Sequence, residues 1–283
     1  MKRNVSCFHK IGILHHPRIP ESQELAREIE TFLKEQEVEV WLGSAWDEES
    51  VKVQMPGTEI LITLGGDGTI LRAGRMAVGY DVLILGLNMG RLGFLAEMEK
   101  DNWPQILEAV LKGDYWVEER MMLKASFRRN RQVKGQYEAL NDVVVSRGTL
   151  ARIVRLATYI DGYYLTTYHA DGLIVSTPTG STAYALAAGG PILPPELRNI
   201  LLIPIAPHLC MDKAVVLSEG SRVYIQVSTD HQAILTVDGQ FEVELKDGDE
   251  VDVCASPHVA HFIRTRDRSY FYHTLLERLR GCY

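Results

Sequence analysis

The residues best suited to chemistry lie at positions 65–69, which read Gly-Gly-Asp-Gly-Thr. They follow an apolar run at 60–64 and precede residues spaced as a short amphipathic helix. We therefore expect them at the carboxyl end of a strand, where open α/β folds bind their ligands. The glycines allow positive φ angles and let phosphate oxygens approach the main chain, and a helix start offers N–H groups to an anion. A carboxylate there, Asp67, suits proton acceptance from a hydroxyl or a divalent cation. The segment is neither a Walker A loop nor a G-x-G-x-x-G fingerprint.

A second segment, residues 171–184, reads as a strand, a hydroxyl-rich turn and then a small-residue helix predicted over 182–188. The hydroxyls of Thr179, Ser181 and Thr182 are able to cap that helix. Four hydroxyls and a glycine within six residues exceed what a cap requires. The alanines that follow leave room for a flat ligand, which Tyr184 would stack on or hydrogen-bond. The segment therefore indicates a binding site.

Two weaker segments complete the set. Residues 88–95, Asn-Met-Gly-Arg-Leu-Gly-Phe-Leu, follow the apolar run 82–87, so we expect them at the same sheet edge as Asp67. Residues 141–142, Asn-Asp, place an amide and a carboxylate at the start of a strand. Each segment taken alone is more typical of a turn than of a site.

The elements that must position these residues fall into two regions. The first alternates strands and helices, which indicates a parallel sheet with helices on its faces. We predict its strands at 11–14, 38–42, 60–64 and 82–87, and its helices at 21–35, 69–78 and 101–111, the last capped by Asp101 and stopped by Gly113.

The second region is dense in short strands. We predict them at 123–127, 142–146, 153–160, 164–168, 173–176, 215–217, 223–227, 234–237, 243–245 and 251–254, with hairpin turns at 161–162 and 246–249. The tail 270–279 is helical again, and we expect it to dock back on the first domain. The sequence thus predicts an α/β Rossmann-like domain, 1–115 with 266–283, an all-β domain, 116–265, and a ligand cleft between them.

The composition of the chain limits the classes of function that it can have. The chain has 283 residues, 46% hydrophobic and 24% charged, with a net charge of -7. This balance is that of a globular protein and argues against a nucleic-acid partner. The longest apolar runs are far shorter than a membrane span, so we expect no membrane. The four cysteines, Cys7, Cys210, Cys254 and Cys282, are scattered, which disfavours zinc or disulfides and fits a cytoplasmic location.

Together and in this order, the four segments resemble the NAD kinase family. The motifs are Gly-Gly-Asp-Gly-Thr, Asn-x-Gly-x-Leu-Gly-Phe-Leu, Asn-Asp-Val-Val-Val-x-Arg-Gly and Asp-Gly-Leu-Ile-Val-Ser-Thr-Pro-Thr-Gly-Ser-Thr-Ala-Tyr, within residues 59–240. The resemblance implies a Rossmann-like domain, a C-terminal β-domain and a last helix that returns to the first domain. It also implies phosphorylation of the adenosine ribose 2′-hydroxyl of NAD to give NADP.

The resemblance also implies residue roles. Asp67 is similar to the proton acceptor of the family. The other positions correspond to residues that bind substrate or nucleotide: Gly66, Gly68, Thr69, Arg72, Asn88, Phe94, Asn141, Asp142, Arg152, His169, Asp171, Thr179, Thr182, Ala183, Tyr184, Ala187 and Gln240. No residue is assigned as a metal ligand. The chain departs from the family at Ala187, where a serine is common, and at residues 212–213, where Arg-Pro is usual.

The implied ligands are NAD, a phosphoryl donor and a divalent metal such as Mg²⁺. The sequence leaves open whether the donor is ATP, another triphosphate or polyphosphate, and whether NADH is accepted. The resemblance implies a homodimer or homotetramer with sites shared between subunits. Two alternatives remain at this point: another kinase with a Gly-Gly-Asp-Gly loop, such as a diacylglycerol or sphingoid lipid kinase or phosphofructokinase, and a non-catalytic dinucleotide sensor.

Overall fold

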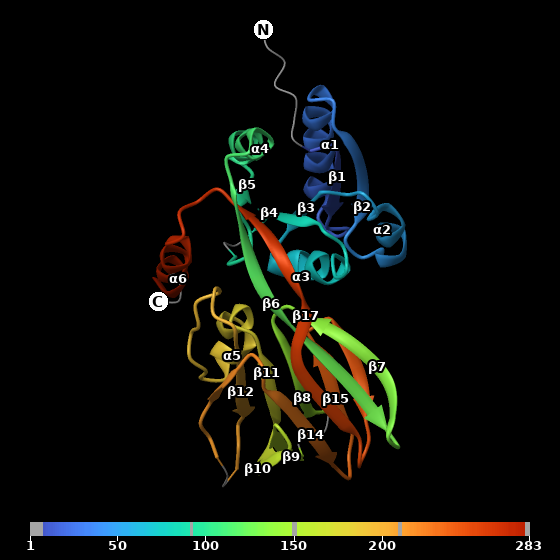
Figure 1. Ribbon diagram of the computed structural model, residues 1–283, viewed down its shortest axis with the longest axis vertical. Coiled ribbons are helices and arrows are strands. Elements are labelled where there is room, and N and C mark those ends of the chain that lie inside the picture. Colours follow the sequence, from blue (N-terminus) through green and yellow to red (C-terminus); the bar gives the residue numbers. More distant parts are fainter. Residues whose placement is uncertain (1–7, 91–92, 149–151, 209–210, 281–283) are drawn as a thin grey trace. The chain divides into compact units, whose positions relative to one another are not determined.

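The computed structural model describes residues 8–90, 93–148, 152–208 and 211–280. The chain divides into two compact units (Figure 1). Unit 1 comprises Met1–Glu119 and Ala260–Tyr283, and unit 2 comprises Arg120–Val259. The chain passes from one unit to the other through two long strands, β6 (Trp116–Arg129) and β17 (Glu250–Arg264).

Unit 1 is built on a parallel sheet, as the alternation of strands and helices predicted. Its strands lie in the order β2-β1-β3-β4, and the end of β17 and the short β5 also pair with β4 in parallel. All six residues of β3 are buried, since it lies inside the sheet with helices on both faces. The bounds are β1 (Lys10–His15), β2 (Glu39–Ser44), β3 (Ile60–Gly65), β4 (Leu83–Asn88) and β5 (Met98–Glu99).

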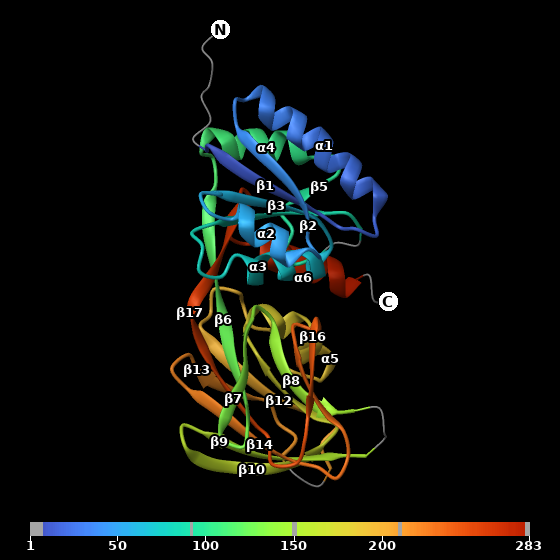
Figure 2. The ribbon, with the colours of Figure 1, turned by 90° about the vertical axis from the view of Figure 1, so that its right-hand side faces the viewer.

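Helices cover both faces of this sheet. Figure 2 shows α1 and α4 over one face and α2 and α3 over the other. The apolar stripes of α1 and α4 share one core with the strands, and the rings of Phe32 and Trp103 meet edge to face with centroids 5.5 Å apart. The bounds are α1 (Pro20–Glu35), α2 (Glu48–Gln54), α3 (Asp67–Met76), α4 (Trp103–Lys112) and α6 (Tyr270–Arg280).

The ends of α4 test the predicted capping signals. Gly113 ends the helix in the left-handed region with φ 89°, which a glycine adopts without a steric penalty. The predicted cap at Asp101 is wrong. Asn102 is the N-cap residue, and its side-chain oxygen accepts a hydrogen bond from the Glu99 N–H, 2.7 Å away, so no side chain caps the first turn.

Unit 2 consists of two antiparallel sheets. One contains the order β10-β9-β14-β17 and the β6–β7 hairpin, and the other has the order β13-β12-β11-β8-β15-β16. The bounds are β7 (Gln132–Ala139), β8 (Asp142–Arg147), β9 (Val154–Ile160), β10 (Tyr163–Ala170), β11 (Gly172–Ser176), β12 (Asn199–Ile205), β13 (Val215–Ser218), β14 (Arg222–Ser228), β15 (Ala233–Val237) and β16 (Phe241–Leu245).

The central strands of the second sheet, β8, β11 and β12, are buried on both faces. In β8, Val143 and Val145 join the main core of unit 2, whereas Val144 points to the other face. That face is covered by a small cluster that includes Ala185 and Leu193, from the segment that follows β11. This segment holds a 3-10 helix, η1 (Thr179–Thr182), and the short α5 (Tyr184–Ala187). The unit is therefore β-rich rather than all-β.

Among the described residues, no helix is long and apolar enough to cross a membrane. Of the four cysteines only Cys254 lies in the described part of the chain, and it is free. Cys7, Cys210 and Cys282 lie outside the described residues.

Candidate active site

The Gly-Gly-Asp-Gly segment joins β3 directly to α3. Helix α3 begins at Asp67, with Gly66 as its N-cap residue, so Asp67 and Gly68 form part of the first helical turn. The predicted start near Thr69 is thus two residues late. A carboxylate in the first turn is stabilised by the positive end of the helix dipole.

The glycines of this segment do not adopt the positive φ angles that the sequence suggested. Gly66 has φ -92° and ψ -176°, and none of the three glycines has a positive φ angle. Gly65 is required by packing, because a Cβ there would lie 2.2 Å from the Thr69 hydroxyl oxygen. A Cβ at Gly66 or Gly68 would meet nothing within 4 Å, so their main chain is open to the approach of a ligand.

The Asp67 carboxylate is fixed by backbone amides of the segment that follows β4. Phe94 N–H donates to Oδ2 at 3.0 Å, and Leu95 N–H donates to Oδ1 at 3.2 Å. Gly93 lies against the same group, since a Cβ at that position would be 2.0 Å from Oδ1. The side chain is half-buried and held in one orientation. This is the geometry required of a proton acceptor that must face one hydroxyl.

The sheet register confirms the expectation that residues 88–95 lie at the same sheet edge as Asp67. Gly65 on β3 pairs with Asn88 on β4, so the two segments leave the same edge of the sheet side by side. The Asn88 side chain folds onto its own loop, donating to the Gly90 carbonyl at 2.9 Å and accepting from the Gly90 N–H. Arg91 and Leu92, in the middle of this motif, lie outside the described residues.

Two basic side chains and one indole lie at the carboxyl ends of β1 to β3. The Arg72 guanidinium, on α3, lies 4.4 Å from the centre of the Trp46 ring, and His16 meets that ring at 4.3 Å. Burial lowers the pKa of Arg72, and burial followed by repulsion from Arg18 lowers the pKa of His16. The cation–π contact holds Arg72 at the edge where an anionic ligand would bind.

In unit 2, residues 141–142 and the hydroxyl-rich segment after β11 pack directly on one another. Thr177 donates its N–H to the Asn141 carbonyl at 2.8 Å and its hydroxyl to the Leu140 carbonyl at 2.6 Å. Gly180 lies against the same carbonyl, because a Cβ there would be 2.3 Å from the Asn141 oxygen. The two motifs, 35 residues apart, form one rigid corner at the start of β8.

Asp238 organises this corner from the β15–β16 turn. Its carboxylate accepts the N–H groups of Leu140, Asn141 and Asp142 at 3.0, 2.8 and 3.1 Å. Burial, and secondly the negative charge of Asp238, raises the pKa of Asp142 to about 7. Asp142 is therefore able to donate as well as accept a hydrogen bond near neutral pH. Gln240 lies in the same turn, and its N–H donates to the Val237 carbonyl at 2.9 Å.

The hydroxyls after β11 do not cap a helix. Ser181 donates to the Pro178 carbonyl at 2.6 Å and accepts the Leu193 N–H at 2.9 Å, while Thr182 donates to the Thr179 carbonyl. Because these bonds fold the chain into a 3-10 turn, the predicted helix over 182–188 is reduced to α5. Ala183, Tyr184 and Ala187 are exposed on its surface.

The remaining predicted residues of unit 2 gather elsewhere. Arg152 and His169, with His208, His231 and others, line a cavity of about 500 Å³, and Arg152 contacts His231 at 2.8 Å. Asp171 pairs with Arg147 at 2.9 Å. In the register of β8 and β11, Asp142 faces Ser176 at one end and Ser146 faces Gly172 at the other. The structure thus divides the predicted residues of unit 2 between opposite ends of these strands.

Gly93, Asp238 and Arg120 are among the residues of this geometry that were not chosen from the sequence. The buried Arg120, 2% exposed, donates to the Thr179 hydroxyl at 3.1 Å. Asp238-Gly239 was readable as a hairpin turn, but the partners of its carboxylate lie 96 to 98 residues away. Gly93 stood inside a recognised motif, and only the position of Asp67 reveals its role.

Comparison with known families gives two matches. Residues 43–115 match the family described as the ATP-NAD kinase N-terminal domain, and residues 140–265 match the ATP-NAD kinase C-terminal domain. Among curated proteins, the chain is 39% identical over 275 residues to an NAD kinase of Dehalococcoides mccartyi, covering 97% of each chain. It is 41% identical over 273 residues to an NAD kinase of Chloroflexus aurantiacus, covering 96% of this chain and 99% of the relative.

Two solved structures are similar over nearly the whole chain. The yeast NADH kinase complexed with NADH has a TM-score of 0.88 and 26% identity, covering 96% of this chain and 87% of that one. An NAD kinase from Archaeoglobus fulgidus in complex with ATP has a TM-score of 0.77 and 30% identity, covering 96% and 98%.

Proposed function

The chain belongs to the NAD kinase family and is a phosphotransferase, and from this premise we propose how its residues act. The resemblance stated from the four motifs is confirmed, as is the plan of an α/β domain followed by a β-rich one. None of the relatives named above is a lipid kinase or a sensor.

Asp67 is the proposed proton acceptor. Its carboxylate takes the proton of the adenosine ribose 2′-hydroxyl as the oxygen bonds to the terminal phosphorus of the donor. The bond from that phosphorus to the bridging oxygen breaks, and the shortened donor leaves with the electron pair. The observation that carries this proposal is the pair of amide hydrogen bonds from Phe94 and Leu95, which orient a half-buried carboxylate.

The start of α3 is the proposed phosphate site. Gly66 and Gly68 leave the main chain uncovered, Thr69 stands in the first turn, and Arg72 supplies a cation at the same sheet edge. A helix start and a guanidinium both favour phosphate oxygens. We propose ATP as the donor, since an ATP-bound relative of 30% identity has this fold, and polyphosphate as the alternative to test.

A divalent cation such as Mg²⁺ is proposed to enter with the donor. Over residues 8–90, 93–148, 152–208 and 211–280, no three His, Cys, Asp or Glu side chains group as a metal site. Mg²⁺ commonly binds through one or two carboxylates together with substrate phosphates rather than in a protein cage, and Asp67 stands at the start of α3 beside the proposed phosphate site. When bound, the cation would offset the phosphate charge, and Asp67, in the first turn of α3, would be the carboxylate available to it.

The corner of unit 2 is proposed to hold NAD. Asn141 and Asp142 would bind ribose hydroxyls, and Thr179, Thr182 and Gln240 would contact the same nucleotide. Ala183, Tyr184 and Ala187 offer an exposed surface on which a flat ring would lie. The hydrogen bonds from Asp238 support this assignment, because they fix the main chain of the ribose-binding pair before the ligand arrives.

The residues at the far end of β8 support an oligomer. Ser146 lies four residue steps along the strand from Asp142, about 13 Å at 3.3–3.4 Å per residue. We propose that Arg152, His169 and Asp171 serve the site of a neighbouring copy in a homodimer or homotetramer. Mixing Asp67→Asn subunits with Asp171→Ala subunits should then restore activity above that of either variant. An active monomer in analytical ultracentrifugation would contradict the shared site.

The scattered cysteines support a cytoplasmic location, where thiols stay reduced. Fractionation of cells with an antibody against the chain would test this. Recovery in an oxidising compartment would overturn it.

One assay tests the function. Purified protein is incubated with Mg²⁺, NAD or NADH and a panel of donors, and NADP or NADPH is detected by a coupled dehydrogenase. Asp67→Asn should lower turnover at least roughly a hundredfold, the scale of a general-base contribution, while NAD still binds. Loss of NAD binding with normal turnover per bound substrate would contradict the role of Asp67.

A further inference from the structure

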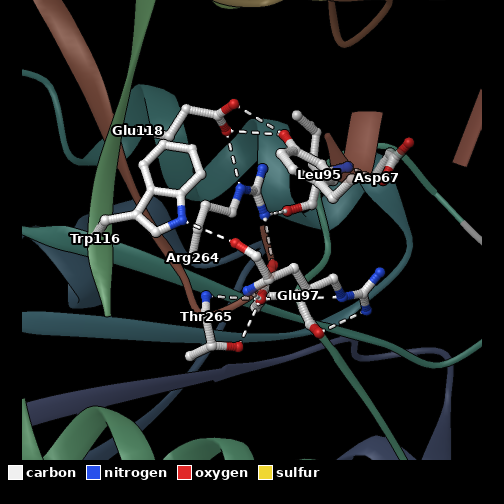
Figure 3. Close-up of polar contacts among 9 residues, drawn as sticks. Asp67, Leu95, Glu97, Trp116, Glu118, Arg264 and Thr265 are labelled. Carbon is white, nitrogen blue, oxygen red and sulfur yellow. Dashed lines mark hydrogen bonds and ion pairs between the residues drawn. The ribbon is translucent and has the colours of Figure 1, made fainter. Parts of the chain in front are cut away.

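A buried network of charges stands behind the segment that holds Asp67 (Figure 3). Its centre is Arg264, the last residue of β17, which is fully buried. Nη1 of Arg264 donates to the Leu95 carbonyl at 2.8 Å, and Nε donates to Glu118 at 2.9 Å. The NADP-forming reaction proposed above does not require this network to bind either substrate.

Leu95 connects the network to the reaction. Its N–H donates to Oδ1 of Asp67 and its carbonyl accepts from Arg264, so one residue carries both links. Figure 3 shows the guanidinium and Asp67 on either side of Leu95. A rotation of the Leu95 main chain would break both hydrogen bonds together.

Glu97, two residues further, ties the same segment to the C-terminal part of the chain. Its Oε1 accepts the Thr265 N–H at 2.8 Å, the Thr265 hydroxyl at 2.7 Å and the Arg266 N–H at 2.9 Å. Glu97 also lies 3.5 Å from Arg264 as an ion pair, and both side chains are fully buried. The chain from Leu95 to Glu97 is therefore bound at several points to residues 264–266.

The guanidinium is in turn held from β6 and α6. Glu118 accepts the Tyr270 hydroxyl at 2.9 Å as well as Nε of Arg264, and Arg264 lies 4.8 Å from the centre of the Tyr270 ring. On α6 the ring of Phe271 lies 5.9 Å from that of Phe94. Burial lowers the pKa of Arg264, but Tyr270, Glu118 and Glu97 outweigh it, so the net direction is upward and the group stays charged.

Stability alone does not account for such a network. Removing two carboxylates and a guanidinium from water costs much of what their attraction returns, and apolar residues of similar size often serve as well. What a buried arginine supplies and a leucine does not is a fixed donor for a main-chain carbonyl. In this chain the carbonyl belongs to Leu95.

We propose that Arg264 is a positioning residue for phosphoryl transfer: through Leu95 it holds the backbone amides that orient the Asp67 carboxylate toward the substrate hydroxyl. The inference rests on the role proposed for Asp67. It gives the C-terminal segment a part in the chemistry, since Thr265, Tyr270 and Phe271 hold the same loop.

A double-mutant cycle tests the inference. Arg264→Met should lower kcat at least roughly tenfold with KM for NAD within about threefold, because one charge-assisted hydrogen bond to the loop is lost. Arg264→Lys should recover part of kcat. In the Asp67→Asn background, Arg264→Met should lower the residual kcat less than about threefold, since the group it orients is already absent.

The matched control is Arg129→Met. Arg129 pairs with the buried Asp249 at 2.7 Å in unit 2, so this variant also leaves a buried carboxylate without its arginine but leaves the loop intact. Its kcat should stay within about twofold of wild type, because a substitution at a distant site is expected to act independently of the loop. If the Arg264 guanidinium were needed only for folding, Arg264→Met would lower kcat by the same factor in the wild-type and the Asp67→Asn backgrounds.

Two outcomes distinguish a failure of the proposed proton acceptor from a failure of the positioning role. If Asp67→Asn keeps wild-type kcat, the proposed proton acceptor is wrong. If Asp67→Asn loses turnover but folded Arg264→Met does not, the positioning role is wrong. Should Arg264→Met fail to fold, Arg264→Lys and Tyr270→Phe carry the test, and wild-type kcat in both would overturn the inference.

Discussion

The substitution Gly93→Ala is the sharpest probe of how the reaction is arranged. A Cβ at this position would lie 2.0 Å from Oδ1 of Asp67, 2.6 Å from Cγ and 2.8 Å from Oδ2. The whole carboxylate occupies that space, so either Asp67 rotates or the segment retreats. Both movements break at least one of the two hydrogen bonds from Phe94 and Leu95.

The magnitude follows from the bond that is lost. A hydrogen bond to a charged group contributes about 1.5–3 kcal/mol, and each 1.36 kcal/mol is a factor of about ten in rate. If the bond acts only by orienting the base, kcat should fall roughly 10- to 150-fold with little change in KM for NAD.

The assay is steady-state kinetics at saturating NAD and ATP, with Tm recorded for each variant. Gly220→Ala is the control, because a Cβ there meets nothing within 4 Å and the residue lies in unit 2. A Gly93→Ala protein that melts like wild type and turns over at the wild-type rate would refute the reasoning.

Three further predictions concern unit 2. The pKa of Asp142 is about 7 in the folded chain against an ordinary 3.8, so between these values the folded chain keeps a proton that the unfolded chain has released. The free energy of unfolding should therefore fall as pH rises across this window, and Asp142→Asn should flatten that dependence in urea titrations at pH 5 and 8; an unchanged slope would contradict the buried acid. Gly180→Ala places a Cβ 2.3 Å from the Asn141 carbonyl oxygen and should raise KM for NAD at least about fivefold, the scale of one lost hydrogen bond, and an unchanged KM would argue against this corner as the NAD site. Ser181→Ala removes the acceptor of the Leu193 N–H and should lower the free energy of unfolding by about 1–3 kcal/mol, so an identical urea midpoint would show that the hydroxyl is dispensable.

The parallel sheet of unit 1 was predictable because its strands are buried on both faces. Strands such as β3 and β4 read as continuous apolar runs, and such runs between helical patterns have few other interpretations. α2 was missed because it has seven residues and buries only Val51, so it carries no apolar stripe.

The strands of unit 2 were harder to read for physical reasons. In β7 only Ala139 is buried, so the alternation that marks a half-buried strand is absent. In β17 the prediction ended at residue 254, but the strand continues to Arg264 through Pro257 and several polar residues. Those residues pair with β4 only over His261 and Phe262, a contact between distant segments that no local pattern encodes.

The sequence located the candidate site but not the means by which it is held. Asp67 and the pair Asn141–Asp142 stood out by type and position. The orientation of Asp67 depends on main-chain amides 27 and 28 residues away, and that of the pair depends on the Asp238 carboxylate. An amide donor has no side-chain signature, since every residue but proline carries one. Motif reading therefore finds the carboxylate and misses its partners.

The same physics predicts where the site is vulnerable. Asp67 and Asp238 each use a carboxylate to gather backbone N–H groups, and in both places the partners are insensitive to side-chain identity. The arrangement does not tolerate an added Cβ atom where two segments of the chain pack together, at Gly93 against Asp67 and at Gly180 against the Asn141 carbonyl. A desolvated polar group is stabilised more by a fixed dipole than by a mobile one, because a fixed dipole does not have to reorient when charge develops in the reaction. It follows that single methyl groups at these two glycines should disturb the reaction more than truncation of exposed side chains beside them, such as Tyr184 at 46% exposure.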